Sequence, residues 1–182
     1  VALGYGALTT QNFTTATNTF NTALGNNTLY ANTTGTDNTA AGYSALTANT
    51  TGNNNIAIGS LAMKTNTVGD RNVAIGYSAL ELYNPATNED SYNVAVGFAA
   101  MEATTTGKNN TAIGGNAMLV NTTGTENTAV GSAALDANTT GDTNVAVGYA
   151  ALSANTTAGE NTAVGAVALL ANTTGAYNTA VG

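Results

Sequence analysis

Ten carboxylates are the residues of this 182-residue chain that come closest to catalytic or metal-binding chemistry. Two pairs of neighbours stand out, Asp70 beside Arg71 and Glu89 beside Asp90. Such pairs can act as a general acid and base or as calcium ligands. The glycine–aspartate repeat of calcium-binding β-rolls is absent, however. Half of the acids lie in the variable turn that precedes a repeated tetrad, and we interpret them as solvated residues that keep the protein soluble: Asp37, Asp70, Glu126, Asp142 and Glu160.

Histidine and cysteine are both absent from the sequence. Their absence removes the commonest general base, thiol nucleophiles, disulfides and the main zinc ligands. The sequence also lacks a Ser/His/Asp set and a phosphate-binding glycine loop. It therefore predicts a protein that is not an enzyme and that holds neither a metal nor a cofactor.

Asparagine recurs seven residues after a repeated glycine, and in most units it begins an Asn-x-Thr sequon. These sequons predict a stripe of N-glycosylation sites if the source glycosylates asparagine. The alternative, which we favour, is a ladder in which the side-chain amides hydrogen-bond along a stack of equivalent residues. The sequons begin at Asn32, Asn49, Asn121, Asn138, Asn155 and Asn172.

Paired threonines, such as Thr139-Thr140 and Thr156-Thr157, recur beside these asparagines. A flat and regular array of hydroxyl groups could match ice or a crystalline polysaccharide. Residues that are β-branched and stabilise stacked strands would give the same pattern. Both readings require the threonines to repeat in space as they do in sequence.

The repeat itself is a tetrad, Thr/Val/Ile-Ala-Val/Ile/Leu/Ala-Gly, that returns with a 17-residue period apart from two spacings of 21. Residues 1–182 therefore form a single repeat array. The glycines of the tetrads are Gly4, Gly25, Gly42, Gly59, Gly76, Gly97, Gly114, Gly131, Gly148, Gly165 and Gly182.

Each unit predicts β-structure. Segments of the type Asn-Thr-Thr-Gly are rich in β-branched residues and helix breakers, and residues 144–148 alternate large and small with the period of a strand. A unit this short cannot bury an apolar face alone, so its neighbours must stack on it. We predict an all-β parallel β-solenoid or β-roll, with one 17-residue repeat per coil and about ten coils.

The columns of the repeat predict which side chains face inwards. The residues that flank the tetrad alanine, such as Ile56 and Ile58 or Val73 and Ile75, lie on one side of a strand, and we expect them to line the core. Leucine or methionine stands four residues after each glycine, as at Leu135, and should form another wall of the core.

The tetrad alanine does not vary. Alternation along the strand points it away from the expected core, so we predict that this column is a homo-oligomer interface. The alternative is a tight corner of the coil that accommodates only a methyl group. The interface prediction concerns Ala57, Ala74, Ala95, Ala112, Ala129, Ala146 and Ala163.

Two four-residue insertions interrupt the period, one within residues 9–20 and one within residues 81–92. Loops that break a regular array often carry binding function, although tolerated length variation explains them equally well. The candidate binding residues are Phe13, Phe20, Tyr83 and Tyr92.

Charge excludes two classes of partner. Only 7% of the residues are charged, the net charge is −7, and the basic residues are Lys64, Arg71 and Lys108. Three scattered cations cannot neutralise a nucleic-acid backbone or an anionic membrane surface. We also expect no direct membrane insertion, because no apolar run reaches the roughly 20 residues of a span.

The tetrads Asn72-Val73-Ala74-Ile75-Gly76 and Asn93-Val94-Ala95-Val96-Gly97 resemble the head repeats of trimeric autotransporter adhesins. The extended unit, Asn-Thr-Ala-Val-Gly followed by Ala-Leu and Asn-Thr-Thr-Gly, is also similar to repeats in phage tail fibres. The resemblance covers the whole chain, but the units here are longer than those of the adhesin heads. It implies a left-handed parallel β-roll whose Val and Ile columns face the core of each chain, with three chains packed through the alanine column.

We therefore expect a structural and adhesive segment of a fibre that is extracellular, on a cell surface or on a virion. Its main partner would be itself, as a homo-oligomer or an end-to-end filament, because neither terminal tetrad has a cap for its strand edge. A surface glycan or receptor is a further expected partner. The alternative function is an ice- or glycan-binding β-solenoid that uses a Thr/Asn face.

Overall fold

The computed structural model describes residues 1–12 and 18–182, which contain strands and turns but no helix. None of the described residues therefore forms a helix that could cross a membrane. The strands are β1 (Ala2–Leu3), β2 (Thr22–Leu24), β3 (Thr39–Ala41), β4 (Ile56–Ile58), β5 (Val73–Ile75), β6 (Val94–Val96), β7 (Thr111–Ile113), β8 (Thr128–Val130), β9 (Val145–Val147), β10 (Thr162–Val164) and β11 (Thr179–Val181).

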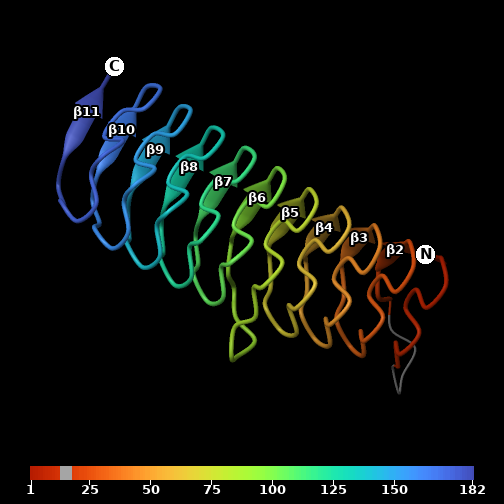
Figure 1. Ribbon diagram of the computed structural model, residues 1–182. Coiled ribbons are helices and arrows are strands. Elements are labelled where there is room, and N and C mark those ends of the chain that lie inside the picture. The colour runs from red at the N-terminus through yellow and green to blue at the C-terminus, as the bar shows by residue number, and fades with distance from the viewer. Residues whose placement is uncertain (13–17) are drawn as a thin grey trace.

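All eleven strands form one parallel sheet in chain order, and one coil joins each strand to the next. Figure 1 shows the coils stacked into a rod with the two ends of the chain at its two ends. At about 4.8 Å per coil, the rod is on the order of 50 Å long. The predicted β-solenoid with one repeat per coil is confirmed.

The register of the sheet follows the sequence period. Thr162 pairs with Thr179, an offset of 17, and this offset holds between β6 and β11 as predicted. Val73 pairs with Val94, an offset of 21, so the insertion in that coil leaves the register of the sheet intact. The four extra residues are accommodated outside the sheet.

The core is built from small strand residues and large turn residues. The central alanine of each strand from β2 to β10 points inwards and is at most 1% exposed. The leucine or methionine four residues after the tetrad glycine packs against it, as predicted, and is fully buried from Leu29 to Leu152. A second alanine column, which includes Ala45 and Ala134, completes the apolar interior.

The predicted orientation of the strands was therefore wrong. The flanking residues that we expected in the core face outwards, and Ile56, Ile58 and Ile75 are 37–41% exposed. The predicted interface alanines, Ala57, Ala74, Ala95, Ala112, Ala129, Ala146 and Ala163, are all fully buried within the single chain and cannot contact a second one. The physical reason is width, because so short a coil leaves room for only a methyl group opposite the Leu/Met column.

The tetrad glycine is required by both conformation and space. Its φ lies between +130° and +141° in every coil, a region open to glycine but not to other residues. At each position from Gly4 to Gly165, a Cβ atom would lie within 3.0 Å of the carbonyl oxygen of the next tetrad glycine. The glycines therefore allow consecutive coils to stack closely at this corner.

Candidate functional site

The outer face of the sheet carries a series of exposed apolar side chains. The strands carry only Thr, Ala, Val, Ile and Leu, so no charge lies on the sheet from β1 to β11. Six of its outward-facing side chains are 37–67% exposed: Leu3, Leu24, Ile56, Ile58, Ile75 and Ile113. Contiguous exposed apolar surface of this kind is typical of a protein–protein contact. We call this surface the sheet face.

The sequon asparagines form a ladder inside the rod. Asn32, Asn49, Asn121, Asn138 and Asn155 are fully buried. The amide of Asn138, for example, donates to the Oδ1 of Asn121 at 3.0 Å and to the carbonyl oxygen of Gly141 at 3.0 Å. A glycan on any of these five nitrogens would break both hydrogen bonds and could not fit in the core, so the folded chain cannot carry them as glycosylation sites. The ladder that we favoured is present.

Asn172 is the exception among the sequons. It is half-buried, and its amide donates to the Oδ1 of Asn155 at 3.4 Å and to the carbonyl oxygen of Gly175 at 2.8 Å. It belongs to the same ladder as the buried members. Glycosylation of Asn172 stays a prediction.

A second asparagine ladder, which the sequence analysis missed, runs the length of the rod. It consists of the residue four positions before each tetrad glycine: Asn21, Asn38, Asn55, Asn72, Asn93, Asn110, Asn127, Asn144, Asn161 and Asn178. The Oδ1 of each accepts the backbone N–H of the next, as from Asn144 to Asn127 at 2.8 Å. An asparagine directly before every tetrad from residue 22 onwards was the signal that could have revealed this ladder.

The threonines are used within the rod as well. The hydroxyl of Thr122 donates to the carbonyl oxygen of Thr139 at 2.9 Å, and Thr139 donates in the same way to Thr156 at 3.0 Å. These donors hold one coil to the next. The asparagines beside them are interior, so this part of the coil does not present a combined Thr/Asn face to ice or glycan.

All three basic residues of the chain form ion pairs with acidic residues of the insertion within residues 81–92. Lys64 pairs with Glu81 at 3.5 Å, Arg71 with Asp90, and Lys108 with Glu89 at 2.6 Å. The Arg71 guanidinium also lies 5.9 Å from the ring centre of Tyr92. Lys64 and Arg71 come from the preceding coil and Lys108 from the following one. The ion pairs therefore connect the insertion to the coils on both sides of it. Figure 1 shows this loop projecting from the rod after β5.

The candidate binding residues of the two insertions differ in their surroundings. Phe20 is 70% and Tyr92 51% exposed, so both are available to a partner. Tyr83 is fully buried in the core and cannot bind one, which corrects the prediction for this residue. Phe13 lies outside the described residues.

Tyr83 replaces an asparagine of the first ladder. It stands between Asn66 and Thr104 in that column and packs, with Pro85, against Gly69. Burial raises the pKa of its phenol to about 12, because the interior disfavours the phenolate. The insertion is thus held in place by the buried side chain of Tyr83 and by the ion pairs on the surface.

The acidic residues singled out in the sequence form no group that could hold a metal in the described part of the chain. Asp70 accepts the backbone N–H of Asn53 at 2.6 Å, while its neighbour Arg71 pairs instead with Asp90. Among the described residues, no group of three or more Asp or Glu side chains could hold a metal ion.

Comparison of the chain with protein-family models, curated proteins and solved structures finds no match.

Proposed function

We propose that this chain is a structural and adhesive segment of an extracellular or virion surface fibre, and that it self-associates through the sheet face. The observation that carries the proposal is the uncharged sheet face, on which six apolar side chains from β1, β2, β4, β5 and β7 are 37–67% exposed. The rest of each coil supports the proposal of a structural role, because two asparagine ladders and an apolar core hold consecutive coils together. Such a rod transmits load along its axis and leaves one side free for a partner.

A second copy of the same chain is the partner that best fits this surface. The sheet face repeats at about 4.8 Å along its length, so an identical rod presents the same spacing. A self-complementary contact, in which the same surface of two copies meets, gives a closed two-fold dimer. A charged partner would gain nothing from a face that carries no charge.

The area of the sheet face grows with the number of coils, and at eleven strands it is below the area of a standard interface. Three residues wide and eleven strands long, it covers roughly 50 Å by 10 Å, or about 500 Å². A standard stable interface buries about 800 Å² on each partner. The association therefore strengthens as coils are added, which is the behaviour expected of a fibre.

Sedimentation velocity over a concentration series tests the proposal. The wild-type chain should sediment as an oligomer, and the double variant Ile75→Glu/Ile113→Glu should sediment as a folded monomer. Thr123→Glu is the matched control, because Thr123 is exposed on a different side of the coil. A wild-type chain that is monomeric at every concentration, or a double variant that keeps the wild-type mass, would contradict the proposal.

A further inference from the structure

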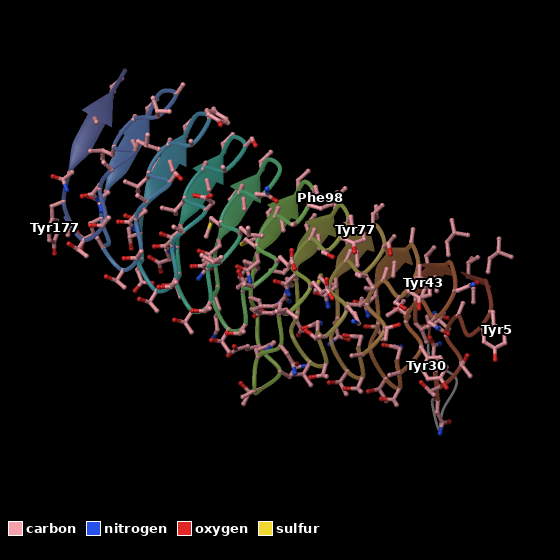
Figure 2. All side chains as sticks on the ribbon, viewed as in Figure 1. Tyr5, Tyr30, Tyr43, Tyr77, Phe98 and Tyr177 are labelled. Atoms are coloured by element: carbon pink, nitrogen blue, oxygen red, sulfur yellow. The ribbon has the colours of Figure 1, made fainter. Side chains whose placement is uncertain are left out.

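A stripe of exposed aromatic rings lies beside the sheet face, where five of the ten residues that directly follow a tetrad glycine are aromatic. Its members are 50–84% exposed: Tyr5, Tyr43, Tyr77, Phe98 and Tyr149. Figure 2 labels four of them, and Tyr77 and Phe98 lie side by side there. The ring centres of this pair are 5.4 Å apart and the rings are stacked at 11°. We call these five residues the aromatic stripe.

The backbone holds the aromatic stripe in register. The carbonyl oxygen of each residue in this column accepts the N–H of the second residue after the next tetrad glycine. Leu61 donates to Tyr43 at 2.9 Å, for example, and Val167 donates to Tyr149 at 2.8 Å. The same bond recurs in every coil, so the rings are set at fixed heights along the rod.

The first three tyrosines of the stripe occur in alternate coils, and the fourth lies four coils further on because Gly115 follows the seventh glycine. Counted by tetrad glycine, Tyr5, Tyr43 and Tyr77 follow the first, third and fifth glycines, and Tyr149 follows the ninth. The height difference between alternate coils is about 10 Å. The intervening positions hold Asn26, Ser60 and Ser132, and Phe98 after the sixth glycine. Tyr5 and Tyr43 therefore have no aromatic neighbour in this column in the adjacent coil, whereas Tyr77 is stacked with Phe98.

One end of the stripe is hollowed into a pocket of about 350 Å³. Tyr5 and Tyr30 form its walls, and Asn27, Ser44 and Thr47 complete its lining. Gly6 allows the close packing behind it, since a Cβ atom there would lie 2.6 Å from the Oδ1 of Asn27 and 3.3 Å from the Tyr30 ring.

The chemistry of the pocket is that of a sugar site. Two tyrosines offer flat apolar faces with hydroxyl groups at their edges, and an amide and two hydroxyls can donate and accept hydrogen bonds. None of the five lining residues is charged. A pocket of this volume with a few polar groups accommodates a small uncharged ring.

We propose that the aromatic stripe binds an extended, uncharged β-1,4-linked polysaccharide that lies along the rod. Such a chain is nearly flat and presents the same face of its rings at every second sugar, a repeat close to the spacing of alternate coils. Alternate sugars contact the rings of Tyr43 and Tyr77, and a further sugar lies in the open hollow lined by Tyr5 and Tyr30 at one end. This inference does not depend on self-association through the sheet face.

Isothermal titration of the wild-type chain with hexasaccharides tests the inference. The probes are β-1,4-linked glucose and β-1,4-linked N-acetylglucosamine, and α-1,4-linked glucose serves as the ligand control because its chain is curved. At least one β-linked probe should bind, and the α-linked probe should bind at least tenfold more weakly. Absence of binding by both β-linked probes, or equal binding of the α-linked probe, would overturn the inference.

Variants locate the binding to the stripe. Tyr43→Ala/Tyr77→Ala should weaken binding at least tenfold, whereas Tyr43→Phe should retain most of it because the ring face remains. The matched control is Tyr177→Ala, which removes an exposed tyrosine from another column, seen away from the stripe in Figure 2. An equal loss in the control, or no loss in the double variant, would place the binding elsewhere and overturn the inference. Circular dichroism of each variant verifies that the rod is folded.

Discussion

At the scale of single residues, the coil depends on backbone conformations that most side chains avoid. In each coil the leucine or methionine four residues after the glycine has φ between +49° and +54°. A left-handed conformation costs a residue other than glycine roughly 1–2 kcal/mol. The burial of these side chains in the core and the hydrogen bonds between coils offset that cost. The left-handed conformation of these residues could not be predicted from their types, because leucine usually occurs in right-handed helical turns or in strands.

The alanine column shows why the sequence predicted the core only in part. The Leu/Met column was placed correctly, since large apolar side chains have one favourable location. The strand faces were reversed because Val and Ile were assumed to be interior and Ala exterior. Variation between the repeat units indicates the buried position better than hydrophobicity does. The flanking positions accept Thr, Val, Ile, Leu or Ala, as at Leu24 and Ala41, whereas the central position accepts only alanine.

Substitution in a single strand tests this assignment of faces. Ala146→Leu should destabilise the rod by about 1–3 kcal/mol or more, because the interior opposite Leu152 is already filled. Its neighbour Val147 faces outwards, so Val147→Leu should change the free energy of unfolding by about 0.5 kcal/mol or less. Denaturant unfolding of both variants measures the difference. Equal effects at the two positions would refute the assignment.

At the scale of elements, the insertion within residues 81–92 is a built part of the rod. The sequence indicated its position but could not indicate its contacts, because Lys64 and Lys108 lie in different coils from their partners Glu81 and Glu89. Those pairs become neighbours only after the coils stack. The buried Tyr83 was likewise hidden, since an aromatic residue in a loop suggests exposure when the column it occupies is not recognised.

Alkaline pH should loosen this insertion first. The pKa of Tyr83 is about 12 in the folded chain against an ordinary value of 10.0. Because the folded pKa is raised, the contribution of Tyr83 to stability is complete below pH 10 and is lost between pH 10 and about pH 12. Tyr83→Phe should therefore lose less stability than the wild type over that interval.

Denaturant unfolding at several pH values measures this difference. Tyr92→Phe is the matched control, because Tyr92 is an exposed tyrosine of the same insertion and its replacement should leave the wild-type pH dependence in place. If Tyr83→Phe follows the wild-type curve between pH 10 and pH 12, the phenol of Tyr83 is not the group that responds.

At the scale of the whole molecule, the rod is a one-dimensional stack. Each coil contacts only the coils before and after it, as the strand order shows. In such arrays the stability is close to a sum of the terms for single coils and for the contacts between neighbours. The sequence predicted this organisation well, because a fixed repeat period specifies which residues meet without knowledge of where they point.

Removal of one complete unit tests this organisation. A chain that lacks residues 115–131 loses β8 and joins Gly114 to Ser132, so every column of the repeat continues in register. It should fold into the same rod, shortened by about 4.8 Å, with a modest loss of stability. Removal of residues 115–123 instead shifts the Leu/Met column and both asparagine ladders out of register, and it should unfold the neighbouring coils. Small-angle scattering gives the length and denaturant unfolding gives the stability of each chain. Equal tolerance of the two deletions would mean that the columns do not hold the coils together.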